Sequence, residues 1–154
     1  MRGLFLDDIE VGAEFESPRR TITEADVVAF TTLTGITDPL FLDETFAAKQ
    51  VHGSRVAPGP LALCYSIGLT EELVYGTTLS ALAIESARFS APLRFGDTIH
   101  VKTRVASVRA SKSRPTTGIV VFEHRILNQH DAMTGEFSRT MLIGTRAHFA
   151  DQNS

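Results

Sequence analysis

An acid and a histidine that could move protons lie close together in the sequence. Asp38 stands in the run "GITDPLFLD", where Ile36, Leu40 and Phe41 surround it with apolar side chains. A carboxylate in apolar surroundings can act as a general base. An Asp before a proline also makes a turn, so Asp38 has both a catalytic and a structural interpretation. His52, in "KQVHGSRVA", is either an acid or base near the same site or a histidine on a surface loop.

Two groups of basic residues could bind the phosphates of a ligand. Arg55 follows His52 closely, in "GSRVAPG". Arg109, Lys112 and Arg114 stand together in "VRASKSRPTTG", which has the composition of a hairpin loop. Guanidinium and ammonium groups bind phosphate through charge-assisted hydrogen bonds, although a solvated hairpin tip has the same composition.

A long apolar segment carries the remaining candidates. Glu71 and Glu72 close it and are either a source of a catalytic carboxylate or a solvated helix end. Tyr65 and Ser66 could line a ligand tunnel or be satisfied core groups. Cys64 is expected to be a small core residue. No metal site is expected, because the spacing of the other histidines does not match a set of metal ligands: His100, His124, His130 and His148.

The composition is that of a soluble globular protein. The 154 residues suit one domain, residues 1–154, and contain 43% hydrophobic and 21% charged side chains. The net charge of -3 argues against a protein that coats nucleic acid or an anionic membrane. No apolar run approaches the ~18 residues of a membrane span, and the N-terminus lacks the pattern of a signal peptide. A single cysteine cannot form an internal disulfide, so a cytoplasmic location is expected.

Three helices are predicted in the first half of the chain. "TITEADVVAFTTLTG" begins at a capping box of Thr23 and Asp26 and ends at Gly35. "LDETFAAKQ" is a second, very short helix with Asp43 as its N-cap. The third begins near Pro60. Because residues 61–69 include no charged side chain, this helix is predicted to be enclosed on all sides.

The second half alternates between apolar and polar residues, as strands do. "DTIHVKTRVASV" places Ile99 and Val101 on one face and His100 on the other. "LSALAIESARFSAP", "GIVVFEHRIL" and "EFSRTMLIGTRAHF" supply three more strands, the last expected to continue to Phe149. The sequence therefore predicts an α+β domain in which an antiparallel sheet curls around one buried helix.

Several motifs resemble those of the MaoC-like dehydratases, hot-dog proteins that include the (R)-specific enoyl-CoA hydratases. They are "TITEADVVAFTTLTG", "DPLFLDETFA", "SRVAPGPL" and "ARFSAPLRFGDTIHV", which together extend over nearly the whole chain. The last contains the run F-x-x-P-x-x-x-G-D, a good marker of the family. The resemblance implies a hot-dog fold, an acyl-thioester ligand and no cofactor.

Hydratases of this family carry D-x-N-P-x-H before the central helix. The Asp and the His hold a water molecule and add it across the enoyl double bond. A Gly that opens the helix offers its N–H to the thioester oxygen, where the helix dipole favours negative charge. In this chain the Asp position is Ile36, the Asn position is Asp38, the His position is Phe41 and the helix-opening Gly is Gly59.

Two further positions of the family pattern are replaced. The His before the Gly corresponds to Pro58, and a Ser further along the helix corresponds to Ile67. The resemblance thus implies that the oxyanion element is kept while the acid, the base and a supporting hydroxyl are lost. Ile36, Phe41, Pro58 and Ile67 would then line an acyl pocket, with Arg55 near the phosphates of coenzyme A.

The sequence leaves several functions open. The first is a weak, atypical or non-catalytic protein that binds an acyl thioester of coenzyme A or acyl carrier protein. The second is an enoyl-CoA hydratase with a non-standard site centred on Asp38 and assisted by His52. The chain could also be the silent subunit of a heteromeric dehydratase, or a hot-dog thioesterase that uses Glu71, Glu72 and His52. At least a dimer is expected, with an identical or a related hot-dog subunit, because an open sheet edge and a shared site call for a partner.

Overall fold

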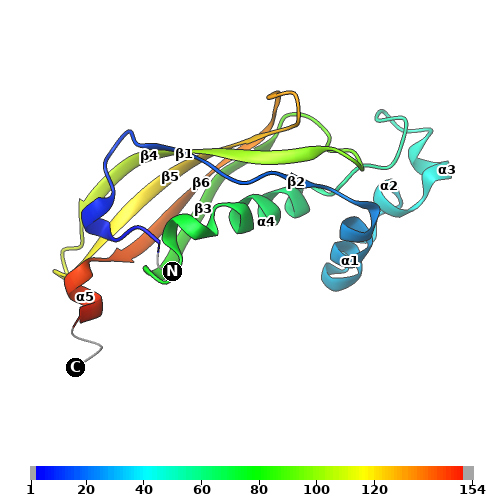
Figure 1. The fold of residues 1–154 in the computed structure, drawn as a ribbon. Coiled ribbons are helices and arrows are strands. Elements are labelled where there is room, and N and C mark those ends of the chain that lie inside the picture. Colours follow the sequence, from blue (N-terminus) through cyan, green and yellow to red (C-terminus); the bar gives the residue numbers. More distant parts are fainter. Residues whose placement is uncertain (1–2, 151–154) are drawn as a thin grey trace.

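Four long strands and one central helix form the body of the protein. The structure is a computed structural model that describes residues 3–150 (Figure 1). Its strands are β1 (Glu14–Glu16), β2 (Arg20–Thr21), β3 (Thr78–Phe89), β4 (Thr98–Ala110), β5 (Thr117–Leu127) and β6 (Met133–Gly144). Its helices are α1 (Glu24–Thr34), α2 (Pro39–Leu42), α3 (Glu44–Ala47), α4 (Gly59–Leu69) and α5 (Arg146–Ala150), with 3-10 turns η1 (Leu6–Asp8) and η2 (Glu71–Val74).

The strands form one antiparallel sheet in the order β1-β4-β5-β6-β3, and β2 also pairs with β4. Alternation along β4 is as predicted, with Ile99, Val101, Thr103 and Val105 all buried. β3 pairs with β6 on one side, and its other side is the edge of the sheet. Most residues of β3 are exposed, unlike those of β5 and β6.

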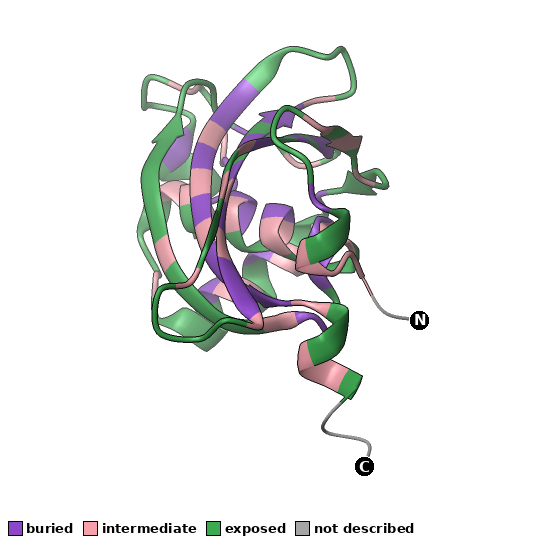
Figure 2. Cartoon of the chain, turned by 90° about the vertical axis from the view of Figure 1, so that its left-hand side faces the viewer, coloured by how far each residue is buried: buried purple, intermediate pink, exposed green. Residues whose placement is uncertain are grey.

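The sheet curls around α4, which confirms the α+β hot-dog prediction (Figure 2). α4 begins as expected, with Pro60 in its first turn. Leu61 is completely buried, and burial of a leucine side chain contributes roughly 1.5–3 kcal/mol to folding. It packs in one core cluster with Ile126 and Phe137 of the sheet. A second cluster around Phe122 fills the other end of the curl.

The first two helices begin and end as the sequence predicts. Thr23 accepts a hydrogen bond from the Asp26 N–H, and the Asp26 carboxylate accepts one from the Thr23 N–H, so the capping box is complete. Gly35 ends α1 with a φ of 74°, in the left-handed region that favours glycine. Asp43 caps α3. Together α1, α2 and α3 project beyond one end of the sheet, next to the N-terminal end of α4 (Figure 1).

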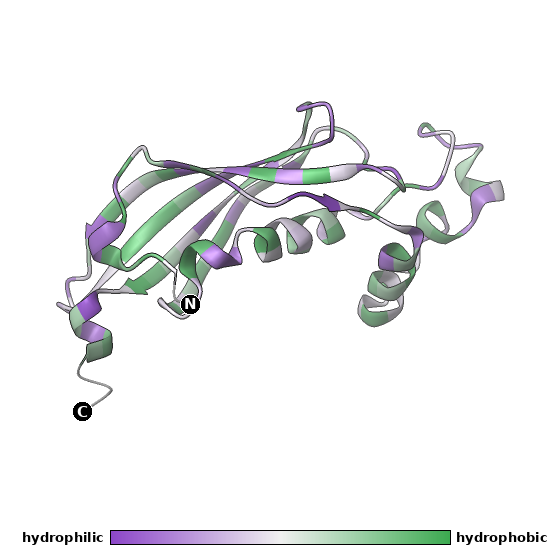
Figure 3. Cartoon of the chain, in the orientation of Figure 1, coloured by the Kyte–Doolittle hydropathy of each residue, from purple (hydrophilic) through white to green (hydrophobic). Residues whose placement is uncertain are grey.

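Two expectations about packing are wrong. α4 is not enclosed on all sides, because Cys64 and Gly68 are exposed. The helix is apolar along most of its length (Figure 3), but β3 ends the sheet and nothing within residues 3–150 covers the side of α4 that carries Cys64. The last strand also stops at Gly144 rather than reaching Phe149, because Thr145 accepts a hydrogen bond from the His148 N–H and starts α5.

Within residues 3–150, no helix combines the length and the apolar character needed to cross a membrane.

Candidate functional site

A cavity of about 300 Å³ lies at the N-terminal end of α4. The chain reaches it from four directions: from α2, from the loop before α4, from the first turn of α4, and from the segment after β3. Thr134 of the next hairpin completes the wall. Most of the lining is apolar: Leu40, Phe41, Val56, Ala57, Gly59, Ala62, Phe89, Ala91, Pro92 and Leu93, with His52, Ser90 and Thr134 as the polar members.

Gly59 gives this cavity its hydrogen-bond donor. It is the first residue of α4, so its N–H has no acceptor within the helix, and none is found elsewhere in residues 3–150. The next residue is Pro60, which has no N–H. A Cβ at position 59 would lie 2.7 Å from the ring of Phe89, so only glycine lets this ring pack against the helix start. The positive end of the helix dipole therefore points a free donor at an apolar cavity.

His52 is held at the cavity by the segment after β3. Arg94 donates from Nη2 to the His52 carbonyl oxygen at 2.8 Å, and from Nη1 to the Ser54 hydroxyl. The Arg94 backbone is fixed in turn, because its N–H donates to Asp97 at 2.8 Å. This gives the run F-x-x-P-x-x-x-G-D a physical role. It supplies Phe89 and Pro92 to the cavity and anchors the loop that carries His52, the one titratable side chain among the lining residues.

The segment with Asp38 lies beside the cavity, but only part of it contributes to the wall. Phe41 lines the cavity, whereas Ile36 is half-buried outside it. Asp38 is exposed, and its Oδ1 accepts a hydrogen bond from the Leu40 N–H at 2.8 Å, so this carboxylate caps α2. The geometry is that of the turn interpretation.

The other predicted pocket residues also have structural partners. Arg55 donates to Glu24 at 2.7 Å and to Glu44 at 3.0 Å, which joins α1 to α3 and raises the pKa of Arg55. Pro58 is buried as the N-cap of α4. Ile67 packs against the core and does not line the cavity.

The two hydroxyls of α4 are bonded within the protein. The Tyr65 hydroxyl donates to Asp26 Oδ1 at 2.7 Å, and Arg20 lies over the Tyr65 ring. Burial opposes the charge of Asp26, but hydrogen bonds from the Thr23 backbone, Tyr65, the Thr23 hydroxyl and Arg20 outweigh it and lower the Asp26 pKa to about 2. Burial and this bond raise the pKa of Tyr65. Ser66 donates to the Ala62 carbonyl oxygen, so neither hydroxyl is aimed at the cavity.

The likeness to known proteins agrees with this geometry. Residues 10–136 match the family described as "FAS1-like, dehydratase domain region". A 3-hydroxybutyryl-CoA dehydratase of Methylorubrum extorquens is 36% identical over 118 residues, which are 74% of this chain and 71% of that protein. The crystal structure of a MaoC-like dehydratase from Rhodospirillum rubrum covers 94% of this chain and 99% of its own, with 29% identity and a TM-score of 0.83. This chain belongs to the MaoC-like dehydratase family.

The fold is also that of a Mycobacterium tuberculosis protein described as having a double hot-dog fold. The two chains share 24% identity with a TM-score of 0.83, over 93% of this chain and 44% of that one. The MaoC-like chain thus corresponds to less than half of the larger protein.

A buried polar layer crosses the core of this MaoC-like protein near the C-terminal end of α4. Arg139 donates from Nε to His124 Nε2 at 3.2 Å and from Nη2 to the Thr70 hydroxyl at 3.1 Å. Because a guanidinium only donates, His124 Nε2 is the acceptor and Nδ1 carries the proton that bonds Thr103 at 2.9 Å. Burial, and then the charge of Arg139, lower the pKa of His124 to about 3. Glu71 lies 3.8 Å from Arg139 at the rim of the layer.

The sequence contains a signal for this layer. Arg139 alternates with Phe137 and Met141, and His124 alternates with Phe122 and Ile126, so both polar residues share the parity of the core face. Their mutual bonding follows from the pairing of β5 with β6.

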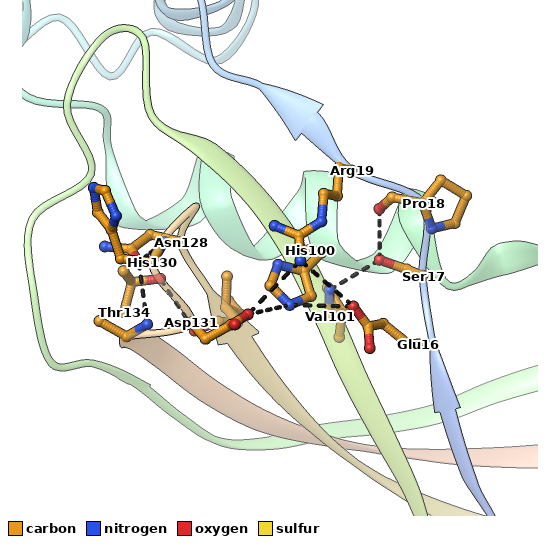
Figure 4. Close-up of polar contacts among 12 residues, drawn as sticks. Glu16, Ser17, Pro18, Arg19, His100, Val101, Asn128, His130, Asp131 and Thr134 are labelled. Carbon is orange, nitrogen blue, oxygen red and sulfur yellow. Dashed lines mark hydrogen bonds and ion pairs between the residues drawn. The ribbon is translucent and has the colours of Figure 1, made fainter.

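A second buried histidine lies on the outer face of the sheet (Figure 4). His100 Nε2 is 3.2 Å from Asp131 Oδ1 and 3.4 Å from Glu16 Oε1, and Arg19 lies 3.7 and 3.8 Å from the same two oxygens. Neither ring nitrogen of His100 has a well-aligned hydrogen bond within residues 3–150. The cluster fastens the N-terminal segment to the β5–β6 hairpin, which also carries Thr134 of the cavity. In the part of the chain that the structure describes, no set of three or more potential ligands is arranged to hold a metal ion.

A larger hollow of about 890 Å³ lies over β1, β4, β5 and β6, away from all these motifs. Its charged residues alternate in sign across the strands, as in Glu14, Arg104 and Glu123, which are successive cross-strand partners. Such ladders are typical of a solvated sheet face, and the hollow lacks the helix-start donor that distinguishes the smaller cavity. The basic residues Arg109 and Arg114 lie at the β4–β5 turn, at the other end of the sheet from Gly59 (Figure 1).

Proposed function

We propose that this MaoC-like protein binds an acyl thioester in the cavity at the start of α4, and that it lacks the usual hydration chemistry of the family. The observation that carries the proposal is the free N–H of Gly59 at an apolar cavity in which Phe41 occupies the place of the expected histidine. The thioester carbonyl oxygen accepts from this N–H, and the acyl chain replaces water against the apolar wall.

The chemistry that remains in the cavity is limited. His52 is the one lining side chain that can exchange a proton, and no carboxylate among the described residues lines the cavity to orient it or to hold a water molecule with it. Asp38 faces its own helix start, so an Asp38-centred hydratase would require a rearrangement of α2. A weak or absent hydration activity follows.

The proposed ligand is an acyl-CoA. The printed name of the Methylorubrum relative is that of an enzyme of a CoA thioester, and the chain covers 71% of that relative. The adenosine phosphates would lie outside the cavity, because a volume of about 300 Å³ accommodates only the acyl end and the start of the carrier.

The proposed partner is a second copy of this chain along β3. This edge strand exposes the apolar residues Leu79, Leu82 and Ile84, and an unpaired apolar edge pairs with another strand. The exposed side of α4, with Cys64 and Gly68, is open next to the same edge. Mass measurement of the purified chain, in solution, separates a homodimer from a chain that needs a related subunit.

A glycine-to-alanine pair tests the binding site. Gly59→Ala places a Cβ 2.7 Å from the Phe89 ring and is expected to weaken binding of butyryl-CoA at least tenfold in a calorimetric titration. Gly68→Ala is the matched control on the same helix, because its Cβ meets nothing within 4 Å. It is expected to bind as the unmodified chain does. Equal affinities of the two variants would show that the thioester does not use the start of α4.

A further inference from the structure

We infer that the cavity selects short acyl chains, of about four to six carbon atoms, because it ends within the first turn of α4. The inference rests on the proposed function and specifies its substrate class. From α4, Gly59 and Ala62 line the cavity, whereas Leu63, Ser66 and Ile67 of the next turn do not. One helical turn rises about 5.4 Å, the length of about four carbon–carbon bonds of about 1.5 Å. A chain whose carbonyl oxygen bonds Gly59 therefore reaches the inner wall after a few carbons.

The inner wall is closed by the core. Ala62 and Leu93, which line the cavity, belong to the same core cluster as Leu61, Ile126 and Phe137. The last three are at most 3% exposed, so the wall has no opening toward the space under α4. A longer chain could advance only by displacing side chains that are packed at the density of a protein interior.

Behind this wall lies the polar layer, which makes displacement unfavourable. The His124 ring stacks on Phe137 with ring centroids 4.5 Å apart, and Arg139 donates to the other side of the network at His124 Nε2. An alkyl chain that moved Phe137 aside would therefore meet a guanidinium that is 4% exposed, whose hydrogen bonds it cannot replace. The layer acts as the end stop of the acyl site.

The inference is tested by a chain-length series on the unmodified protein, with acetyl-, butyryl-, hexanoyl-, octanoyl- and dodecanoyl-CoA titrated by calorimetry. Affinity is expected to rise about fourfold for each methylene group that enters the cavity, to reach its maximum at butyryl- or hexanoyl-CoA, and to be at least tenfold lower for dodecanoyl-CoA. An affinity that still rises at dodecanoyl-CoA overturns the length limit and leaves the proposed function in place. Failure of every thioester to bind overturns the proposed function, and the length limit with it.

Two leucine variants locate the limit. Leu93→Ala removes part of the wall and is expected to move the affinity maximum toward octanoyl-CoA. Leu63→Ala removes the same number of atoms from the next turn of α4, which does not line the cavity, and is expected to leave the maximum unchanged. If Leu93→Ala does not fold, Ala62→Val narrows the cavity instead and is expected to weaken hexanoyl-CoA more than acetyl-CoA. An equal shift at both leucines, or an equal loss for both thioesters in Ala62→Val, contradicts the assignment of the wall.

Discussion

The two ends of α4 are both buried against the sheet, yet their polar groups are used in opposite ways. At the C-terminal end, Thr70, His124 and Arg139 bond to one another. At the N-terminal end, the Gly59 N–H has no acceptor within residues 3–150 and points into an apolar cavity. Groups that a protein satisfies internally support its fold, whereas a donor left open at a cavity is available to a ligand. The comparison places the binding site at one end of α4 and structural support at the other.

The helix dipole accounts for the direction of this asymmetry. The N-terminal end of α4 carries partial positive charge and suits the developing negative charge of a thioester oxygen. The C-terminal end carries partial negative charge and suits a cation, and Arg139 lies there, bonded to Thr70. Electrostatics alone would therefore assign the two ends different partners.

The largest expected effect comes from making the cavity end polar. Ile36→Asp combined with Phe41→His restores the residue types that the family uses to hold and activate water. Turnover of crotonyl-CoA is expected to increase 10²–10⁴-fold over the unmodified chain, the usual contribution of general acid–base catalysis. Product is followed by mass, with each single variant as a control. A double variant that folds and binds the thioester but stays inert would show that α2 does not bring these positions to the substrate.

The next effect comes from making the other end apolar. Arg139→Met leaves the acceptor at His124 Nε2 and the Thr70 hydroxyl without their donor, at a cost of about 2–4 kcal/mol in the free energy of unfolding. Urea denaturation measures this cost. Arg125→Met is the control on the same sheet, because Arg125 is exposed, and is expected to change stability by less than about 0.5 kcal/mol. Equal stabilities of the two variants would remove the polar layer from the structural account.

Acid should weaken the polar layer selectively. The pKa of His124 is about 3 in the folded chain and 6.5 ordinarily, so the unfolded chain binds more protons between these values. Stability therefore falls as pH decreases through this window, with a slope that approaches about 1.4 kcal/mol per pH unit. Denaturation between pH 6.5 and 5 measures the slope before most carboxylates titrate. His124→Gln cannot take up a proton and is expected to reduce the slope, whereas an unchanged slope would mean that His124 is not buried neutral.

The smallest effect is expected at Arg55, beside the cavity but outside its lining. Arg55→Gln breaks the ion pairs with Glu24 and Glu44, whose side chains are more than half exposed, so the loss of stability is about 0.5–1 kcal/mol. Because both carboxylates already occupy its guanidinium, the affinity for butyryl-CoA is expected to change less than twofold. A tenfold loss of affinity at unchanged stability would instead make Arg55 a phosphate ligand.

Local features of this fold could be predicted from the sequence, because their causes lie within a few residues of one another. The capping box of Thr23 and Asp26, the cap at Asp43 and the alternation along β4 all hold in the structure. The family motifs also indicated the start of α4 at Gly59.

Features that depend on distant segments could not be predicted in this way. The bond between Thr70 and Arg139 spans 69 residues and exists only because β6 passes under the end of α4. The exposure of Cys64 depends on the position of β3 at the sheet edge, which the apolar sequence of α4 does not encode. Asp38 could be a base or a cap from its neighbours alone, and only the direction of its carboxylate toward the Leu40 N–H shows the cap.

The most direct test of the account offers crotonyl-CoA to the purified, unmodified chain and follows binding and hydration in the same sample. The account predicts saturable binding with hydration no faster than in the absence of protein, because the cavity keeps its donor at Gly59 and lacks the water-activating pair. Hydration that disappears in Asp38→Asn would contradict it, and would establish an enzyme whose base has moved to Asp38.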